Sequence, residues 1–396
     1  MKVTMISNYI NHHQIPFCEE FFARLGEDYK FIQTEPMEEE RIAMGWAVEE
    51  SKLPYLLILD RQEELCKSLI EESDILIIGW NEKEELFRNR LKGNKLTFRM
   101  SERIYREGQW KAISPRGLLR KYREHIQYRN KPVYLLCAGA YVASDFSLIK
   151  AYPKKQLRFG YFPEFIKYSE KELEENHPWG SRKNEKEIQL VWAGRFLPLK
   201  HPEMAIALAA SLEKKGYRFH LHMIGGGEME KELKLQAEKM HLKERITFYG
   251  FCSPKEVRGI MEKCHIHLFT SNHLEGWGAV VNEAMNCGCV EVANSQAGAV
   301  PYLVKQGENG FIYHEGSYQD MEEKVQYLLE HPIQSSGIGK KAYETIACQW
   351  NAKEAVERLL KFHENWQKGE IMWQKEGPLS KAPVISPGKV RDYLQL

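Results

Sequence analysis

The run from Asp74 to Gly79, DILIIG, constrains the fold most, because it is continuously apolar after its first residue. A strand with one solvated face alternates apolar and polar residues, whereas a strand covered on both faces does not. Other β-rich runs and helical stretches alternate with it along the first half of the chain. This alternation predicts an α/β domain with a doubly wound parallel sheet. The strands are expected at 3–7, 29–33, 95–100 and 133–137, with helices at stretches such as 15–25 and 62–72.

A polar, charged stretch from Glu164 to Glu187 interrupts this pattern and is expected to connect two domains. The alternation then restarts, with strands expected at 188–193, 220–224, 246–248, 266–269 and 290–293. Two similar Rossmann-like halves with a cleft between them are the simplest architecture. The expected divisions are a first domain at 1–165, a linker at 166–187, a second domain at 188–350, and a helix and tail at 351–396 that can cross back to the first domain.

Composition excludes several classes of protein. The formal net charge of +1 on 396 residues argues against a nucleic-acid binder. No apolar run approaches the length of a transmembrane helix, and the first residues lack the pattern of a signal peptide. The eight cysteines are scattered without CxxC spacing, as expected for buried thiols in a reducing compartment. These observations predict a cytoplasmic protein.

Two glutamates eight positions apart, Glu275 and Glu283, flank the expected start of a helix near Trp277. A helix start offers unpaired backbone amides that suit a phosphate, and the glycines at 276 and 278 let a ligand approach the backbone closely. Carboxylates would repel phosphate, but each can accept hydrogen bonds from neighbouring hydroxyl groups. The pattern therefore indicates a diphosphate at the amides with a diol on each side.

Three further elements precede this pair in the sequence. Gly194 ends a strand, and Arg195 and Lys200 follow as two cations that can stabilise charge on a leaving phosphate. Gly225 and Gly227 form a turn between a strand and a helix, although Glu230 departs from a dinucleotide fingerprint. Phe251 follows the next strand and is expected to line the cleft.

In order and spacing, these four elements resemble the retaining glycosyltransferases of family four (glycosyl transferases group 1), of the bacterial polysaccharide-biosynthesis type. The resemblance implies the GT-B fold, with two Rossmann-like domains facing a cleft, of which 1–165 would bind the acceptor and 188–350 the nucleotide-sugar. It also implies that Glu275 meets the donor sugar, that Glu283 meets the ribose, and that Arg195 and Lys200 hold the leaving group. The implied catalytic residues are Arg195, Lys200 and Glu275, and the implied donor-binding residues are Gly194, Gly225, Gly227, Phe251, Gly276, Trp277, Gly278, Ala279, Val280, Val281 and Glu283.

The function implied is transfer of a sugar from a nucleotide-sugar donor, expected to be UDP-linked, to a glycan or lipid-linked glycan in cell-surface polysaccharide synthesis. Two alternatives stay open: a UDP-sugar 2-epimerase, and a non-catalytic subunit that binds sugar nucleotides. No Asp-x-Asp sequence occurs, and such pairs hold Mg²⁺ or Mn²⁺ in glycosyltransferases of the other large fold. Neither a metal nor another cofactor is therefore expected.

The first half departs from the family pattern, because NYINHHQ follows the first strand where glycines are usual. Asn11, His12, His13 and Glu102 are expected to contact the acceptor. Residues 103–131 carry nine basic and two acidic residues interleaved with apolar ones, with a helix start expected at Ser114 and Pro115. This stretch can lie peripherally on the inner face of the plasma membrane, line the cleft for an anionic lipid-linked acceptor, or form a solvated helix face.

Overall fold

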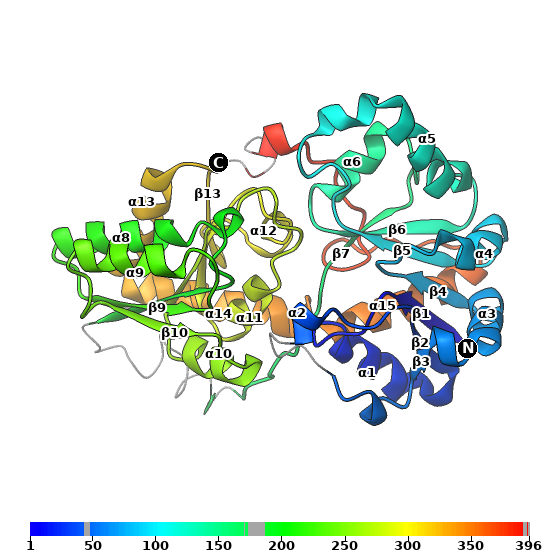
Figure 1. Ribbon diagram of the computed structural model, residues 1–396, viewed down its shortest axis with the longest axis horizontal. Helices are drawn as coiled ribbons and strands as arrows, with labels where there is room; N and C mark the ends of the chain where they lie inside the picture. The colour runs from blue at the N-terminus through cyan, green and yellow to red at the C-terminus, as the bar shows by residue number, and fades with distance from the viewer. Residues whose placement is uncertain (43–47, 170, 173–186, 391–393, 395–396) are drawn as a thin grey trace. The chain divides into compact units, whose positions relative to one another are not determined.

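The computed structural model describes residues 1–42, 48–169, 171–172, 187–390 and 394. The chain forms two compact units (Figure 1). Unit 1 comprises Met1–Glu164 and Asn351–Ser386, and unit 2 comprises Phe165–Trp350 and Pro387–Leu396. Most of the predicted linker, namely 170 and 173–186, lies outside the described residues.

Unit 1 is built on a seven-stranded sheet in the order β3-β2-β1-β4-β5-β6-β7, in which every strand pair is parallel. All four residues of β4 are buried, as the apolar run of the sequence predicts. The strands are β1 (Val3–Ser7), β2 (Tyr29–Gln33), β3 (Leu56–Ile58), β4 (Ile75–Ile78), β5 (Thr97–Ser101), β6 (Val133–Ala138) and β7 (Gln156–Phe159).

Helices cover both faces of this sheet. The helices are α1 (Ile15–Leu25), α2 (Glu39–Arg41), α3 (Glu63–Glu72), α4 (Arg88–Lys92), α5 (Pro115–Glu124), α6 (Val142–Leu148) and α15 (Ala352–Gln367). One core joins the sheet to α3, α4 and α6 through residues such as Ile70, Leu91 and Phe146. On α15, the Phe362 ring packs edge-on against Phe98 and Tyr134 of the sheet at centroid distances of 5.5 and 4.9 Å.

The segment from Gly377 to Ser386, which follows α15, is held in unit 1. Leu379 and Ala382 donate backbone hydrogen bonds to Arg158 O and Gln156 O at 2.9 and 3.0 Å, and Arg158 donates to Ser380 O at 2.7 Å. This segment therefore lies antiparallel beside the edge strand β7.

Unit 2 has a six-stranded parallel sheet in the order β10-β9-β8-β11-β12-β13. One face packs on α8, α9 and α13, and the other packs on α10 and α11. The strands are β8 (Ile188–Ala193), β9 (Phe219–Ile224), β10 (Ile246–Gly250), β11 (Ile266–Phe269), β12 (Val290–Asn294) and β13 (Gly310–Tyr313). The helices are α8 (Pro202–Lys214), α9 (Glu230–Lys239), α10 (Pro254–Met261), α11 (Val280–Asn286), α12 (Val300–Leu303), α13 (Tyr318–Glu330) and α14 (Pro332–Cys348).

Candidate functional site

The predicted donor residues gather at the carboxyl edge of the sheet of unit 2. The chain adds β9 and β10 on one side of β8 and then places β11 on the other side, so the direction of winding reverses between β8 and β11. Ligands of open α/β sheets bind outside the carboxyl ends of the strands at such a reversal. Gly194 and Arg195 follow β8, and the loop leading to Glu275 follows β11.

Lys200 and Glu275 form an ion pair. This contact was not predicted from sequence, where Lys200 was expected to hold the leaving group and Glu275 the donor sugar. Lys200 ends the short 3₁₀ helix η8 (Pro198–Lys200), and both side chains are largely buried, at 18% and 15% exposure. Pairing lets the lysine neutralise the carboxylate while its remaining N–H groups stay available as donors. Each of the two groups therefore fixes the position of the other beside the carboxyl edge.

The loop after β11 is tied to the loop after β8 by further hydrogen bonds. Asn272 N donates to Leu199 O at 2.9 Å, and the Asn272 amide lies 3.1 Å from His201 Nε2. The buried Thr270 hydroxyl also joins the two loops, and it was missed from sequence because threonine after a strand carries no distinctive signal. These contacts hold the Lys200 and Glu275 loops in a single arrangement.

The glycines of the turn after β9 are required by close backbone approach. A Cβ on Gly225 would lie 1.9 Å from Gly194 O, and one on Gly227 would lie 2.7 Å from Phe196 O. Their φ angles of +126° and +152° also disfavour side chains. The neighbouring Gly226 faces the Phe251 ring, because a Cβ there would lie 2.7 Å from Phe251 Cε2. Gly194, Gly225, Gly227 and the exposed Phe251 thus share the carboxyl edge.

The helix after Glu275 begins later than expected, at Val280 instead of near Trp277. Gly278 has a φ of +92°, and a Cβ there would lie 2.5 Å from Phe269 Cζ. Within the described residues, the backbone amides of Gly278, Ala279 and Val280 donate no hydrogen bond. The amide of Val281, another predicted donor-binding residue, donates to Gly278 O at 3.0 Å.

Trp277, one of the predicted donor-binding residues, has its side chain in the core of unit 2. The indole is 1% exposed, and Nε1 donates to Asn282 Oδ1 at 2.8 Å. Tyr302 and Trp350 lie near it, with ring centroids 6.4 and 6.0 Å away. The Trp277 side chain therefore fixes the turn that carries Gly276 and Gly278.

Glu283 lies on α11, one turn into the helix, with its side chain partly buried. Burial raises the pKa of this carboxyl to about 7, and the charges of Arg258 and His267 partly oppose that rise. The carboxyl is thus close to half ionised at neutral pH. A ligand hydroxyl that donates to the ionised form would shift the balance toward the carboxylate.

A second buried pair lies within the sheet of unit 2, on the neighbouring strands β11 and β12. It was not predicted from the sequence. His267 on β11 and Glu291 on β12 are opposite each other in the parallel register, and both are fully buried. His267 Nδ1 lies 2.9 Å from each carboxylate oxygen of Glu291. Burial raises the pKa of Glu291, while His267 lowers it. The two residues are far apart in sequence, so only the strand pairing reveals the contact.

The predicted acceptor residues all lie in unit 1. Asn11 Oδ1 accepts a hydrogen bond from His13 N at 3.0 Å in the turn that leads into α1. The His12 and His13 rings have centroids 3.9 Å apart. Burial lowers the pKa of both, that of His13 to about 3, with the His12 charge as a further cause. Both imidazoles are therefore neutral at physiological pH.

Glu102, the fourth predicted acceptor residue, follows β5 at the carboxyl edge of the sheet of unit 1. Its carboxylate forms an ion pair with Arg106 and accepts a hydrogen bond from the Tyr161 hydroxyl at 3.0 Å. Glu102 is thus fixed by two partners from its own unit.

Known proteins resemble unit 2 in sequence. Residues 174–345 match the family model described as glycosyl transferases group 1. The putative glycosyltransferase EpsD of Bacillus subtilis is 26% identical over 44% of this chain and 45% of its own length. The amylovoran biosynthesis glycosyltransferase AmsK of Erwinia amylovora is 25% identical over 33% of each chain. The matched region thus spans less than half of these curated relatives.

Solved structures share the fold over both units. Anabaena HepE in complex with UDP superposes with a TM-score of 0.64 at 15% identity, covering 91% of this chain and all of that one. Sucrose-phosphate synthase from Thermosynechococcus elongatus gives 0.62 at 13% identity over 93% of this chain. At these identities the likeness shows the fold alone. Residues 174–345, within the second unit, thus resemble the glycosyl transferases group 1 family, and the two Rossmann-like domains have the GT-B fold.

Proposed function

We propose that this protein is a retaining hexosyltransferase that moves a sugar from a UDP-linked donor to a glycan or lipid-linked glycan during synthesis of cell-surface polysaccharide. The observation that carries the proposal is the Lys200–Glu275 pair, set beside a turn whose amides at Gly278, Ala279 and Val280 donate no bond within the described residues. Cation, amides and carboxylate together suit a diphosphate that bears a sugar. HepE, which shares the fold, has been solved with UDP and with UDP-glucose.

The proposed mechanism depends on how the site stabilises the negative charge that develops on the leaving diphosphate. When the bond between the sugar C1 and the diphosphate oxygen breaks, negative charge grows on the phosphate, and Arg195 and Lys200 are the proposed partners for it. The acceptor hydroxyl attacks C1 from the face that the phosphate leaves, and its proton passes to the departing phosphate. Glu275 holds sugar hydroxyls, so no side-chain nucleophile is required.

We propose that transfer needs no metal ion, because two cations and the open amides supply the positive charge. Activity should therefore survive treatment with EDTA. Loss of activity in EDTA that added Mg²⁺ or Mn²⁺ restores would refute this part of the proposal.

A panel of UDP-sugars tests the main proposal, with release of UDP as the readout and lipid-linked sugar extracts as the acceptors. Lys200→Met and Glu275→Gln should each lower UDP release by at least about a hundredfold, since each removes a charged contact in the site. Lys234→Met is the matched control, because Lys234 also pairs with a glutamate, Glu230, but on the exposed face of α9. The proposal would be refuted if all three variants released UDP at the same rate.

Two alternatives remain to be separated from it. A UDP-sugar 2-epimerase would convert its donor without an acceptor, so the C2 epimer would appear when the protein is incubated with the donor alone. A non-catalytic subunit would bind UDP without releasing it from any UDP-sugar, and Lys200→Met would leave polymer synthesis in cells unchanged.

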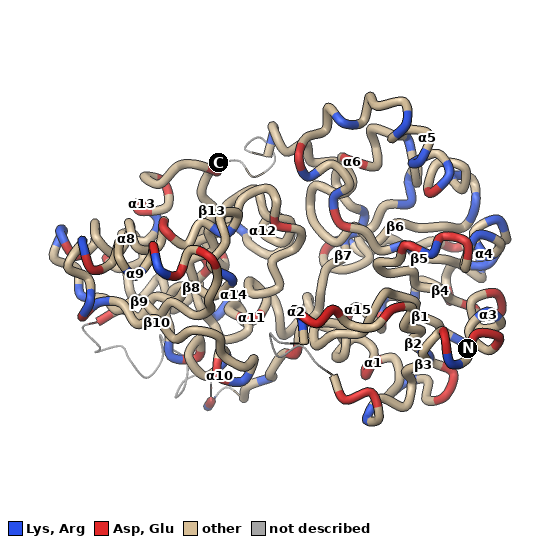
Figure 2. Tube along the Cα trace, in the orientation of Figure 1, with Lys and Arg blue, Asp and Glu red and all other residues tan. Residues whose placement is uncertain are grey.

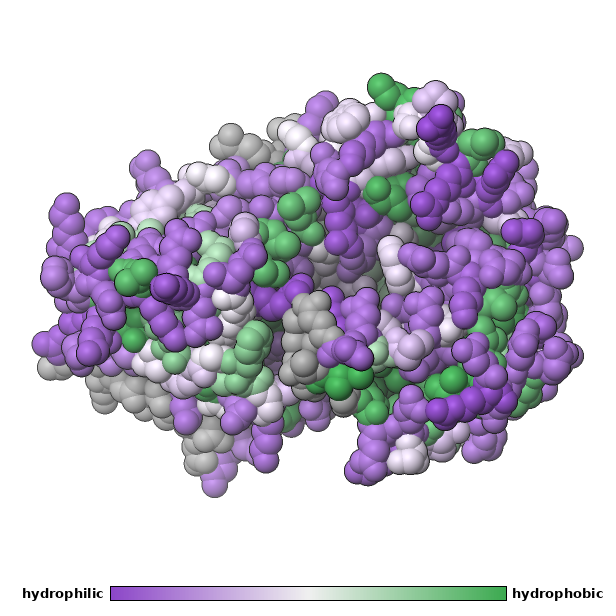
Figure 3. All heavy atoms as spheres, in the orientation of Figure 1, coloured by the Kyte–Doolittle hydropathy of each residue, from purple (hydrophilic) through white to green (hydrophobic). Residues whose placement is uncertain are grey.

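We further propose that unit 1 touches the inner face of an anionic membrane through the α5 patch, defined as Trp110, Ile113, Leu118, Leu119 and Tyr122. All five side chains are exposed, Ile113 at 83%. Basic residues surround them along α5 (Figure 2), and hydrophobic side chains reach the surface there (Figure 3). Exposed apolar groups among cations suit the boundary between lipid head groups and acyl chains.

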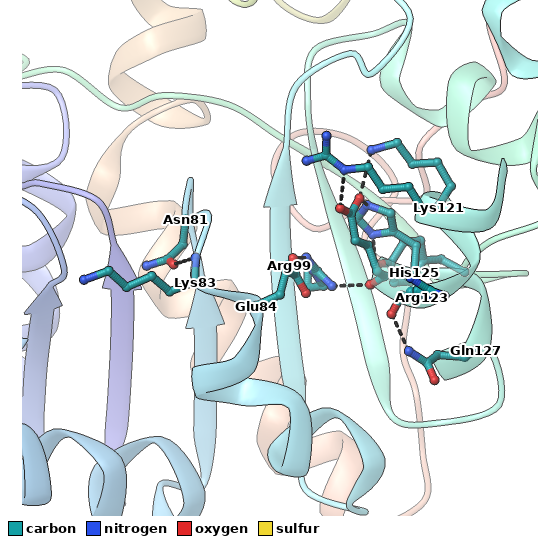
Figure 4. A network of polar contacts seen from close by, with 11 residues as sticks. Asn81, Lys83, Glu84, Arg99, Lys121, Arg123, His125 and Gln127 are labelled. Atoms are coloured by element: carbon teal, nitrogen blue, oxygen red, sulfur yellow. Dashed lines mark hydrogen bonds and ion pairs between the residues drawn. The ribbon is translucent and has the colours of Figure 1, made fainter. Parts of the chain in front are cut away.

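The α5 patch is supported from beneath by a polar network (Figure 4). The Arg99 guanidinium on β5 forms an ion pair with Glu84 and donates to Glu124 O near the end of α5. His125, which follows α5, lies 2.8 Å from the Tyr152 hydroxyl through Nδ1. These buried contacts fix α5 to the sheet, so the apolar face is presented by a rigid support.

Vesicle sedimentation tests the membrane proposal. No described helix combines the length and apolar content needed to span a bilayer, so attachment would rest on this surface. Binding to vesicles with phosphatidylglycerol should exceed binding to phosphatidylcholine vesicles and should weaken with salt. Ile113→Ser with Leu119→Ser should abolish it, whereas Leu65→Ser, at another exposed leucine of unit 1, should not.

A further inference from the structure

Trp80 is a large aromatic side chain left exposed at the point where the sheet of unit 1 reverses its direction of winding. The chain adds β2 and β3 on one side of β1 and then places β4 on the other side. Trp80 stands two positions after the last residue of β4, and its side chain is 66% exposed. Tryptophan is usually well buried, and the carboxyl edge at such a reversal is where open α/β sheets bind ligands.

The backbone of Trp80 is held by β1, so the exposed indole does not belong to a loosely attached loop. Trp80 O accepts hydrogen bonds from Asn8 N at 2.7 Å and from Ser7 Oγ at 3.2 Å. Gly79 N donates to Ile6 O at 2.8 Å, and a Cβ on Gly79 would lie 2.9 Å from Ser7 Oγ. The two strand ends therefore approach as closely as a glycine permits.

The residues after Trp80 are held in turn by the end of β2. Asn81 Nδ2 donates to Thr34 Oγ1 at 2.9 Å, and Asn81 Oδ1 accepts from Lys83 N at 2.7 Å. Lys83 Nζ donates to Thr34 O at 3.0 Å. Figure 4 shows Asn81 and Lys83 beside each other at this edge. The backbone that carries the exposed indole is thus fixed on both sides.

We infer that Trp80 is a stacking platform for a sugar ring of the acceptor, an inference that rests on the proposed glycosyltransferase function. One face of a pyranose carries C–H groups that pack on an aromatic ring, while its hydroxyls stay free for polar neighbours. The predicted acceptor residue Asn11 lies in the segment after β1 that begins with Asn8, so both belong to one edge.

Fluorine NMR on protein labelled with 5-fluorotryptophan tests this inference directly. The probes are the methyl glycosides of glucose, galactose, mannose and N-acetylglucosamine. The Trp80 resonance, identified by its loss in Trp80→Phe, should shift with at least one glycoside. The resonance of Trp366, on α15 of the same unit, should not shift. If no glycoside moves the Trp80 signal, or if both signals move together, the inference is wrong.

Kinetics with the responding glycoside as acceptor give the second test. Trp80→Ala should raise the acceptor KM by about tenfold, with the affinity for UDP unchanged, and Trp80→Phe should retain most of the acceptor affinity. Leu65→Ala, which removes another exposed apolar side chain of unit 1, should leave the acceptor KM unchanged. An unchanged KM in Trp80→Ala with intact UDP binding would refute the platform alone, whereas absence of UDP binding in the unmodified protein would refute the proposed function.

Discussion

The Thr270 hydroxyl donates a hydrogen bond to the backbone carbonyl of Lys200 at 2.6 Å, across a separation of seventy positions in the sequence. The same hydroxyl accepts a hydrogen bond from Trp192 Nε1 at 2.8 Å. One buried oxygen therefore links the core of unit 2 to the backbone of the lysine that pairs with Glu275. The position of Lys200 is set by the core and not only by its own loop.

Thr270→Val should weaken UDP binding several-fold, because valine keeps the shape of threonine but leaves Trp192 Nε1 and Lys200 O without their partner. The same loss should cost about 1–3 kcal/mol of unfolding free energy. Thr270→Ser retains the hydroxyl and should restore most of both quantities. Isothermal titration with UDP and urea unfolding measure them, and normal UDP affinity in Thr270→Val would show that the hydroxyl does not position Lys200.

Gly225→Ala should destabilise the protein by about 2–5 kcal/mol, because the new Cβ would meet Gly194 O and the φ of +126° strains any side chain. Gly216→Ala is the control, since that glycine has a positive φ but nothing within 4 Å of the added atom. It should cost only about 1 kcal/mol. Equal urea midpoints for the two variants would contradict the close approach of β8 and β9.

UDP affinity should rise as the pH is raised from 6 to 8, because Glu283, whose pKa is about 7, then becomes a carboxylate able to accept ribose hydroxyls. The raised pKa also means that this group stabilises the fold most at low pH. That contribution is lost as the pH rises through about 7. Titrations at several pH values check the binding, and Glu283→Gln should flatten the part of the profile that this group causes. A profile identical in both proteins would contradict the assignment.

Replacing Glu291 alone by leucine should cost about 3–5 kcal/mol, because His267 would be left buried without its partner. Replacing both residues by leucine should recover much of this loss, since no polar group then remains unpaired. Urea unfolding of the two single variants and the double variant gives the coupling energy between them. A double variant no more stable than Glu291→Leu would show that the pair is not coupled in this way.

The sequence predicted the central strands best. β1, β2, β8 and β11 have the predicted bounds, and each of them pairs with a strand on both sides. The three strands that were not predicted are β3, β7 and β13, and each is three or four residues long at the edge of its sheet. An edge strand has fewer neighbours, so its pattern is short and its pairing depends on tertiary structure.

In the candidate site, too, individual residues could be predicted from the sequence, whereas their contacts could not. Motif spacing identified Lys200 and Glu275, but their ion pair depends on two loops meeting after separate strands. The burial of Trp277 was missed because its partners Tyr302 and Trp350 come from distant segments. Trp80 was missed because exposure of a tryptophan cannot be read from a run that looks uniformly apolar.

The return of α15 to unit 1 has a consequence for biosynthesis. The main segment of unit 2 runs from Phe165 to Trp350, whereas unit 1 needs the residues from Asn351 to Ser386 to cover the sheet and flank β7. A ribosome therefore completes the whole of Phe165–Trp350 before it supplies the last helix of the domain it began with. During that interval the aromatic face of Phe98 and Tyr134 is uncovered, and the nascent amino-terminal half is open to chaperones until translation has passed α15.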